Sequence, residues 1–394
     1  MKLKSEQAAA FNDLLTRGVD EIIDKKNLEI KLNAGKPLRI KFGIDPTSPN
    51  IHIGRSIPLL KLRDFQKLGH KIVLIIGDFT GVIGDTSDKD SERPMLSEEQ
   101  VKINMDNYIE QAGKIIDLKE CEIHHNSEWL SKLDYKEICL QTNVFSLADF
   151  IARDNIRKRL EAGKRISLRE VLYPLMQGYD SVVVKADVEI GGTDQRFNLL
   201  AGRELQRFYQ QSPQDVITGP LIEGLDGRKM SSSWGNTINL LDEPKEMYGK
   251  IMSLKDELIV KYFLLTTRLD LKKIEEYKKS IVEGANPRDF KMKLAFELVS
   301  FYHSLKDAEA AEKYFIDTFS KKETPAEIVQ IKPSEYNIIT ALLEAKLVPS
   351  KTEARRIIES NGVKINEENI SDYKMPVKKG DIIQKGKRFF IKII

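Results

Sequence analysis

The chain is poor in cysteine, the residue that builds structural zinc sites and disulfide frameworks. Its 394 residues include two, Cys121 and Cys139, and neither lies in a Cys-x-x-Cys motif or a Cys/His cluster. This scarcity argues against a structural zinc site and against a disulfide-rich fold. We expect both thiols to be buried as small hydrophobic side chains, and we predict no protein-bound metal.

Long apolar segments are also missing. A strongly apolar run such as Ile72–Ile76 is far shorter than the ~20 residues that a membrane-spanning helix needs. The first residues, MKLKSEQAAAFNDLLTRG, carry a charge every few positions and lack the apolar core of a secretory signal. We therefore expect no membrane partner and a cytoplasmic location.

Neither sign of charge dominates the chain, because the net charge is only +3. The distribution is uneven, since residues 334–394 hold 12 Lys and Arg against 8 Asp and Glu. The basic excess therefore lies at the carboxyl-terminal end, where it favours binding of an acidic partner such as nucleic acid.

What the sequence does contain is an α/β pattern in its first half. A strand is predicted over Leu38–Ile44, a helix over Arg55–Leu68 and a second strand over Lys71–Gly77. A third strand is expected within Val182–Ile190, which ends in two glycines. The pattern indicates a parallel sheet, and ligands of such sheets gather at the carboxyl ends of the strands.

The second half is organised differently. After about Asp242 the pattern is that of Lys/Glu-rich helix up to about Lys322, and the proline-containing segment 322–334 is typical of a linker. Beyond it, Ser350 and Glu353 form a capping-box pattern at the start of a helix, and short strands follow. We predict three domains, with boundaries at 1–222, 223–325 and 334–394.

The first motif that carries chemistry is DPTSPNIHIGR, from Asp45 to Arg55, between a strand and the start of a helix. The free N–H groups and dipole of a helix start form a natural phosphate site. Gly54 would let the backbone approach a ligand, and His52 and Arg55 can donate to phosphate oxygens. The short string HIGR alone is a common chance match, and its position after a strand favours the functional interpretation.

The second motif is the loop GRKMSSS, from Gly227 to Ser233. Its lysine and hydroxyls can bind phosphate oxygens whose charge grows during reaction, and Met230 can anchor the loop. Taken alone it would be interpreted as a solvated linker. The two motifs together, in this order and a domain's length apart, form a specific signal.

These strings resemble the HIGH and KMSKS motifs of class I aminoacyl-tRNA synthetases. KFGIDPT, GDFTGVIGDTSDK, YPLMQGYD and GGTDQ follow in the order typical of the tyrosyl family, and the resemblance extends over nearly the whole chain. It implies a Rossmann-type parallel-sheet catalytic domain, a helical anticodon-binding domain, a small α+β S4-like RNA-binding domain, and a homodimer.

The resemblance also implies roles for individual residues. The catalytic group would comprise His52, Arg55, Lys229, Ser231, Ser232 and Ser233. Tyrosine would be bound by Lys41, Asp85, Tyr173, Gln177, Asp180 and Gln195. ATP would be bound by Asp45, Thr47, Gly54, Lys89, Arg93, Gly192, Asp194 and Lys229. Binding of transfer RNA is predicted instead from basic charge, at Arg153, Arg157, Lys158, Lys351, Arg355, Arg356 and Lys364.

Three positions depart from the family pattern. Arg55 stands at the last histidine of HIGH, and Ser232 stands at the second lysine of KMSKS. Lys41 occupies the position of a tyrosine that donates to the substrate phenol in many members. Phosphate binding should survive the change to Arg55, whereas Lys41 puts an ammonium in place of the tyrosine donor at the phenol pocket.

The chemistry implied by the resemblance needs no nucleophilic side chain. The tyrosine carboxylate would attack ATP, accompanied by Mg²⁺, and the tyrosyl group would then pass to the terminal adenosine of tRNA(Tyr). Two alternatives remain open on the sequence alone: another class I synthetase, such as the tryptophanyl enzyme, and a non-catalytic RNA-binding relative. The basic segment Arg153–Arg165 is as well explained by a solvated helix face as by tRNA binding.

Overall fold

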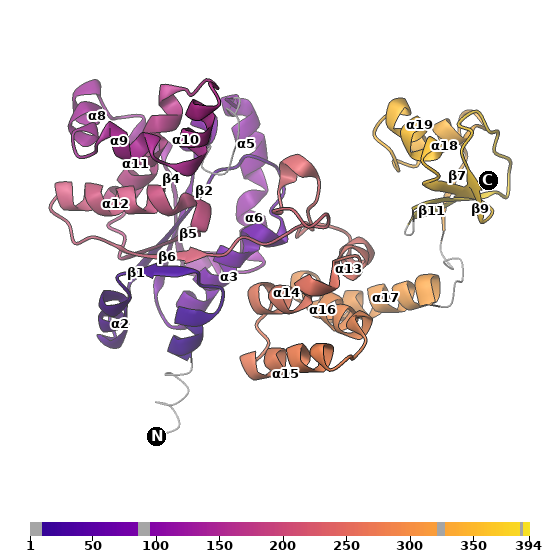
Figure 1. Ribbon diagram of the computed structural model, residues 1–394, viewed down its shortest axis with the longest axis horizontal. Coiled ribbons are helices and arrows are strands. Elements are labelled where there is room, and N and C mark those ends of the chain that lie inside the picture. Colours follow the sequence, from indigo (N-terminus) through magenta and orange to yellow (C-terminus); the bar gives the residue numbers. More distant parts are fainter. Residues whose placement is uncertain (1–9, 86–94, 321–327, 387–388) are drawn as a thin grey trace. The chain divides into compact units, whose positions relative to one another are not determined.

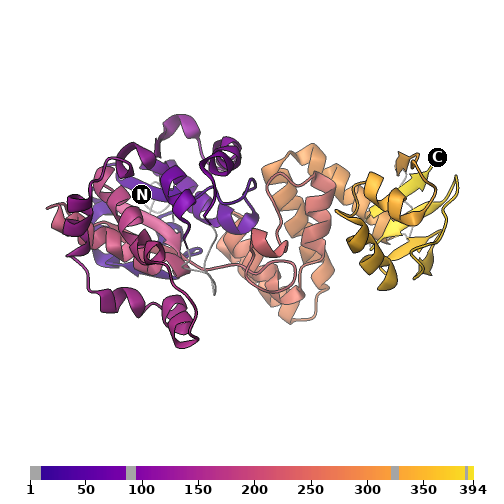
Figure 2. The ribbon, with the colours of Figure 1, turned by 90° about the horizontal axis from the view of Figure 1, so that it is seen from above.

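The computed structural model describes residues 10–85, 95–320, 328–386 and 389–394. Contacts within the chain divide it into two compact units, residues 1–304 and 305–394. Figure 1 shows the elements of each unit coloured along the sequence, and Figure 2 gives a second view.

The first unit contains a six-stranded sheet with the order β1-β6-β5-β2-β3-β4. All neighbouring strands are parallel except β1 and β6, which are antiparallel. The strands are β1 (Glu21–Ile23), β2 (Arg39–Ile44), β3 (Lys71–Ile76), β4 (Cys121–His125), β5 (Val188–Gly192) and β6 (Asp215–Gly219). From β2 the chain adds β3 and β4 on one side and later β5 and β6 on the other, so the order reverses between β2 and β5. That reversal is where a parallel sheet leaves a crevice for ligands.

Helices cover this sheet and fill the connections between its strands (Figure 1). α3 packs against β2, β3 and β5, while α11 and α12 pack against each other and α12 against β5 and β6. The helices of this part are α2 (Lys25–Asn33), α3 (Ile53–Lys67), α4 (Asp78–Ile83), α5 (Glu98–Asp106), α6 (Tyr108–Gly113), α7 (Ser127–Leu130), α8 (Tyr135–Thr142), α9 (Leu147–Ile151), α10 (Asp154–Glu161), α11 (Leu168–Val183) and α12 (Arg196–Phe208). In β3 every residue after Lys71 is buried, as expected for a strand covered on both faces.

The helical segment predicted after Asp242 is confirmed. It begins with α13 (Pro244–Met252), α14 (Ile259–Thr266), α15 (Leu271–Val282) and α16 (Pro287–Tyr302). These helices are joined to the sheet part by the buried hydroxyls of Ser56 and Tyr302, which lie 2.8 Å apart, and by a half-buried ion pair between Arg268 and Asp64 at 2.8 Å.

One predicted strand was placed too early. Val182 and Val183 end α11, and β5 begins only at Val188. A capping box between Ser167 and Glu170 starts this helix, and its 16-residue length outweighs the β preference of the valines. Lys185, with φ of 50°, then breaks the helix before the strand.

The expectation that both cysteines are buried is wrong. Cys139 is exposed on α8, and Cys121 is half-buried in β4, where its Sγ donates to the backbone oxygen of Asp117 at 3.2 Å. Among the described residues, no group of three or more His, Cys, Asp or Glu side chains is placed to hold a metal ion.

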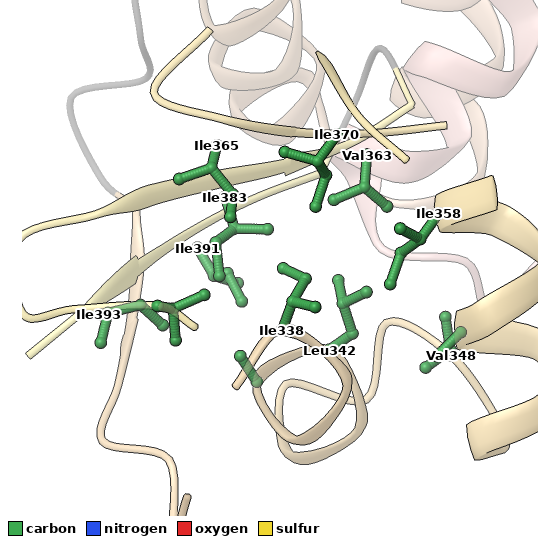
Figure 3. Packing of buried hydrophobic residues seen from close by; sticks show 13 residues of the cluster. Ile338, Leu342, Val348, Ile358, Val363, Ile365, Ile370, Ile383, Ile391 and Ile393 are labelled. Carbon is green, nitrogen blue, oxygen red and sulfur yellow. The ribbon is translucent and has the colours of Figure 1, made fainter. Parts of the chain in front are cut away.

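The second unit holds a five-stranded sheet and two helices packed on it, after an initial helical segment. Its elements are α17 (Leu305–Phe315), a π-helical turn (Ile316–Ser320), β7 (Val329–Ile331), α18 (Ile338–Glu344), α19 (Lys351–Glu359), β8 (Val363–Ile365), β9 (Glu368–Ile370), β10 (Ile382–Lys385) and β11 (Phe389–Ile393). Figure 3 shows aliphatic side chains of both helices and of the sheet converging in one core. The predicted cap is confirmed, because Ser350 Oγ accepts from the N–H of Glu353 at 3.2 Å. The expected linker contains β7, which pairs in parallel with β11.

The predicted fold class is confirmed: a parallel α/β sheet part, a helical part and a small α+β part follow one another along the chain. The boundaries 1–222, 223–325 and 334–394 stay predictions.

Candidate active site

A cavity of about 250 Å³ opens where β2, β3, β5 and β6 end. Its wall includes Asp45 after β2, Gly77 after β3, Gly192 at the end of β5 and Gly219 at the end of β6. Both sequence motifs contribute to this wall, so residues 45–55 and 229–233 meet in one place. The cavity therefore lies at the topological reversal of the sheet.

His52 connects the first motif to the start of α3. Its Nδ1 accepts a hydrogen bond from the N–H of Arg55 at 3.3 Å, which caps the helix. Burial, together with the charges of Arg55 and Lys229, lowers the pKa of His52 to about 3. The imidazole is therefore neutral at pH 7, and because Nδ1 is an acceptor, its proton is on Nε2. A buried N–H donor at a helix start suits a phosphate oxygen.

The rest of the first motif is held rigidly. The guanidinium of Arg55 donates to Thr47 Oγ1 at 2.8 Å and to the hydroxyl of Tyr108. A Cβ at Gly54 would lie 3.0 Å from His52 Nδ1, so a larger residue would crowd the imidazole. The motif therefore presents a fixed cation and a neutral donor to the cavity that they line.

The second motif closes against the first. Met230 is buried, and its Sδ accepts from the N–H of Gly54 at 3.4 Å. The hydroxyls of Ser48 and Ser232 lie 3.3 Å apart. Asn236 stabilises the loop, because its Oδ1 accepts a hydrogen bond from the N–H of Ser231 at 2.8 Å. Asn236 was not anticipated from the sequence.

Lys229 reaches across to the end of β5. Its Nζ lies 2.8 Å from Asp194 Oδ2, and both side chains are partly exposed to the cavity. Two residues predicted to bind ATP from distant parts of the sequence are thus brought together. Ser231, Ser232 and Ser233 line the same cavity.

Asp45 links the strand ends around the cavity. Its Oδ1 accepts from Thr80 Oγ1 at 2.8 Å, and its Oδ2 accepts from the hydroxyl of Tyr173 at 2.7 Å. A Cβ at Gly77 would lie 2.0 Å from Asp45 Oδ1, which explains why glycine follows β3. Burial and the nearby carboxylates raise the pKa of Tyr173 well above its usual value, so this hydroxyl stays protonated.

Asp180 also lines the cavity and is 3% exposed. Its carboxylate accepts from Trp129 Nε1 at 2.8 Å and from Asn126 Nδ2 at 3.4 Å. Burial raises its pKa to about 7, against the opposing influence of Lys41 and the two donors. Neither Trp129 nor Asn126 was anticipated, because no strand was predicted before them. Asn126 directly follows β4, and Trp129 lies in the short helix α7 that comes next.

Three further residues predicted to bind tyrosine line the cavity: Asp85, Gln177 and Gln195. Gln177 Nε2 donates to Glu189 at 3.1 Å, and its Oε1 accepts from Asn198 at 3.1 Å. Gln195 Oε1 accepts from the N–H of Gly192 at 3.3 Å.

Lys41 differs from the other predicted tyrosine ligands. It is fully buried and does not line the cavity, because its ammonium is directed to Gln177, Ser181 and Glu189. The two predicted pyrophosphate residues, Lys89 and Arg93, lie outside the described residues.

The predicted RNA-binding residues occupy two separate surfaces. On α10 and before it, Arg157 and Lys158 are exposed, whereas Arg153 is partly buried over the rings of Phe150 and Phe197, at 5.5 and 5.0 Å. Arg153 is thus less accessible than its sequence context suggests.

The second surface belongs to the carboxyl-terminal unit. Lys351, Arg355 and Arg356 are exposed on α19, and Lys364 is half-buried on β8. Arg355 lies over the ring of Tyr373 at 5.1 Å, and Arg356 pairs with Glu353 at 2.7 Å. Within the described ranges, no helix is long and apolar enough to cross a membrane.

Comparison with known proteins defines the class of this site. Residues 33–320 match the family described as tRNA synthetases class I (W and Y). Residues 318–392 match the Tyrosine--tRNA ligase SYY-like C-terminal domain. A synthetase of class I thus accounts for the two motifs, the sheet and the carboxyl-terminal unit.

Curated relatives are more specific. One from Thermotoga maritima, named Tyrosine--tRNA ligase, is 45% identical over 385 residues, covering 96% of each chain. Another from Idiomarina loihiensis, with the same name, is 46% identical over 398 residues and covers 99% of each chain. The chain therefore belongs to the tyrosine–tRNA ligase family.

Solved structures agree on the fold. Tyrosyl-tRNA synthetase from Archaeoglobus fulgidus, complexed with L-tyrosine, is similar with a TM-score of 0.61 and 24% identity, over 77% of this chain and 99% of that one. A truncated mitochondrial tyrosyl-tRNA synthetase from Aspergillus nidulans has a TM-score of 0.66 at 21% identity, over 79% of this chain and 94% of that one.

Proposed function

We propose that this protein activates L-tyrosine with ATP to form tyrosyl-adenylate and pyrophosphate, and then transfers the tyrosyl group to the 3′-terminal adenosine of tRNA(Tyr). The single observation that carries the proposal is the meeting of the His52 and Lys229 motifs in one cavity that also contains Asp180. Groups that can bind phosphate and a buried carboxyl group that can accept from a phenol then share one wall.

In the first step the tyrosine carboxylate attacks the α-phosphorus of ATP, and pyrophosphate leaves. We infer that His52 Nε2–H, Arg55 and Lys229 stabilise the charge that grows on the phosphate oxygens. The serines of the loop add hydroxyl donors. Mg²⁺ arrives with ATP as part of the substrate, and the protein contributes position and electrostatics.

The nucleotide and the amino acid use different parts of the wall. Asp45, Thr47, Gly54, Gly192 and Asp194 hold the nucleotide, and Asp194 exchanges its pairing with Lys229 for the ribose hydroxyls when ATP binds. Lys89 and Arg93 are proposed to reach the pyrophosphate.

On the amino-acid side, Asp85, Tyr173, Gln177 and Gln195 surround the ammonium and carboxylate of tyrosine. Asp180 accepts a hydrogen bond from the phenol. Phenylalanine lacks the hydroxyl and would leave this hydrogen bond unmade at a buried polar group, which disfavours that competitor.

In the second step a ribose hydroxyl of the tRNA attacks the carbonyl carbon of the adenylate. Lys351, Arg355, Arg356 and Lys364 are proposed to bind tRNA phosphates, together with Arg157, Lys158 and Arg153 near the catalytic part. We also propose a homodimer. Exposed apolar side chains on α8, α9 and α11, including Tyr135 at 88%, Leu147 and Leu168, support it, because a second copy would cover them.

The proposal is tested by the exchange of labelled pyrophosphate into ATP with tyrosine, tryptophan or phenylalanine as the added amino acid. Exchange that depends on tyrosine alone supports the assignment. Exchange driven by tryptophan would contradict the proposed substrate, and folded protein without exchange would indicate a non-catalytic relative.

A further inference from the structure

A buried ion pair lies behind the amino-acid pocket. Lys41 on β2 and Glu189 on β5 are register partners across the reversal point of the sheet, and Lys41 Nζ lies 2.8 Å from Glu189 Oε1. Both residues are 0% exposed, and neither lines the cavity.

Every proton of the lysine ammonium has an acceptor. Besides Glu189, Nζ donates to the backbone oxygen of Gln177 and to Ser181 Oγ, each at 2.7 Å. Lys41 is therefore fully satisfied by the protein and is not oriented to donate to a substrate phenol. Its contacts hold two residues of α11 against β2.

The carboxylate of Glu189 is equally well satisfied. Its Oε1 also accepts from Gln177 Nε2 at 3.1 Å, and its Oε2 accepts from Ser181 Oγ at 3.1 Å and from Gln214 Nε2. The space is tight, because a Cβ at Gly202 would lie 2.7 Å from Gln214 Nε2. The network is thus sealed between β5, α11 and α12.

Stability alone is a weak reason for such a pair. Desolvation of two charges often cancels their attraction, so apolar residues of similar size are frequently as stable. A buried network does, however, fix the orientation of the groups that it contacts. The group that connects this network to the cavity is the carboxamide of Gln177.

An ionised carboxylate accepts hydrogen bonds and cannot donate them. Glu189 therefore requires the Nε2 side of the Gln177 amide to face it. The flipped amide would place Gln177 Oε1 against the carboxylate oxygen of Glu189, and neither atom could donate. Asn198 Nδ2 donates to Gln177 Oε1 at 3.1 Å and selects the same orientation. The second lone pair of Oε1 is then available to accept a hydrogen bond from a cation in the cavity.

We propose that Lys41 and Glu189 act as a positioning pair for the amino-acid substrate: they fix the Gln177 carboxamide so that its oxygen receives the α-ammonium of tyrosine. This inference rests on the proposed function of Gln177 and revises the expectation for Lys41, which positions α11 and does not bind the phenol.

The decisive variant is Glu189→Gln, which keeps the shape but removes the acceptor-only group that requires Gln177 Nε2 to face it. Asn198 is then the one remaining contact of this network that favours the same amide orientation. The dissociation constant for tyrosine should rise by about 10-fold or more, the value of a charge-assisted hydrogen bond. The KM for ATP should change by less than about 2-fold. Asp215→Asn is the matched control, because Asp215 is also fully buried and pairs with Lys31 at 2.9 Å.

A ligand without the ammonium makes the test specific. The desamino analogue 3-(4-hydroxyphenyl)propionate should bind the wild type and Glu189→Gln with equal affinity. A 10-fold loss for this analogue as well would overturn the assignment to the ammonium and would favour a contact with the phenol. If the wild type bound no tyrosine at all, the proposed function would fail, independently of the pair.

The double variant Lys41→Met/Glu189→Gln separates positioning from folding, because it leaves no unpaired buried charge. Its melting temperature should return toward that of the wild type while the affinity for tyrosine stays low. Recovery of both quantities together would show that the pair serves only the fold. A loss of melting temperature in Glu189→Gln with unchanged tyrosine affinity would overturn the inference in the same way.

Discussion

His52 has two separable tasks, which two substitutions can distinguish. Its Nδ1 caps α3, and its Nε2–H is the donor that we propose for the α-phosphate. His52→Asn keeps a short side-chain oxygen that can accept from the N–H of Arg55, but it loses the reach of Nε2. His52→Gln keeps a longer N–H donor and loses a favourable capping residue.

The expected magnitudes follow from these contacts. His52→Asn should lower the rate of adenylate formation by ~10²–10³-fold, because one preorganised donor to the transition state is lost. Its stability should be close to that of the wild type. His52→Gln should retain activity within about 10-fold while losing about 1 kcal/mol of unfolding free energy with the cap. Single-turnover adenylate formation and urea unfolding measure the two effects on the same samples.

The low pKa of His52 adds a signature in pH. A histidine whose folded pKa is lowered from 6.5 to about 3 contributes stability that is present above pH 6.5 and is lost as the pH falls. The wild-type unfolding free energy, relative to that of His52→Gln, should therefore decrease by up to about 5 kcal/mol between pH 6.5 and pH 3. An imidazole that titrates near pH 6.5 by NMR, or equal rate losses in both variants, would refute this account.

Three further predictions concern other parts of the site and the carboxyl-terminal unit. Lys229→Ala should slow adenylate formation by ~10²-fold or more with unchanged tyrosine affinity, measured by single-turnover kinetics and equilibrium binding; unchanged turnover would contradict its role. Asp180→Asn should abolish discrimination between tyrosine and phenylalanine in pyrophosphate exchange. Because the folded pKa of Asp180 is raised from 3.8 to about 7, the wild type should also lose up to about 4 kcal/mol relative to this variant as pH rises from 4 to 7, measured by urea unfolding. Ending the chain before Val329, so that β7 is removed with its sheet, should preserve pyrophosphate exchange and greatly reduce tRNA charging; parallel loss of both with melting temperature would indicate a purely structural unit.

The elements around the phosphate site could be predicted from the sequence because their signals are local. A β-branched strand, a turn rich in Gly, Pro and Asp, and a helix start place His52 and Asp45 at a strand end without any tertiary information. The GGTDQ segment placed Asp194 in the same way. The strand-edge rule did not by itself predict the meeting of Asp194 with Lys229, because Lys229 lies in a loop beyond β6 and not at a strand end. That loop was assigned to the site through its pairing with the first motif and through the family resemblance.

The phenol side of the cavity could not be predicted to the same degree. Trp129 and Asn126 follow β4, an edge strand whose five residues are all half-buried and whose sequence, CEIHH, has no clear β pattern. The buried partner of Lys41 is 148 residues away, and only the pairing of β2 with β5 brings it near. Only tertiary contacts therefore distinguish Lys229, which lines the cavity, from Lys41, which is buried against Glu189 behind it.

The most direct test of the central claim is the charging of tRNA(Tyr) with labelled tyrosine by the full-length protein. The account predicts ATP-dependent formation of an alkali-labile ester on the terminal adenosine, a ~10²-fold or greater slowing in Lys229→Ala, and no ester with tRNA(Trp) and tryptophan. A folded protein that binds tRNA(Tyr) but never forms the ester, or one that charges tRNA(Trp) instead, would contradict it.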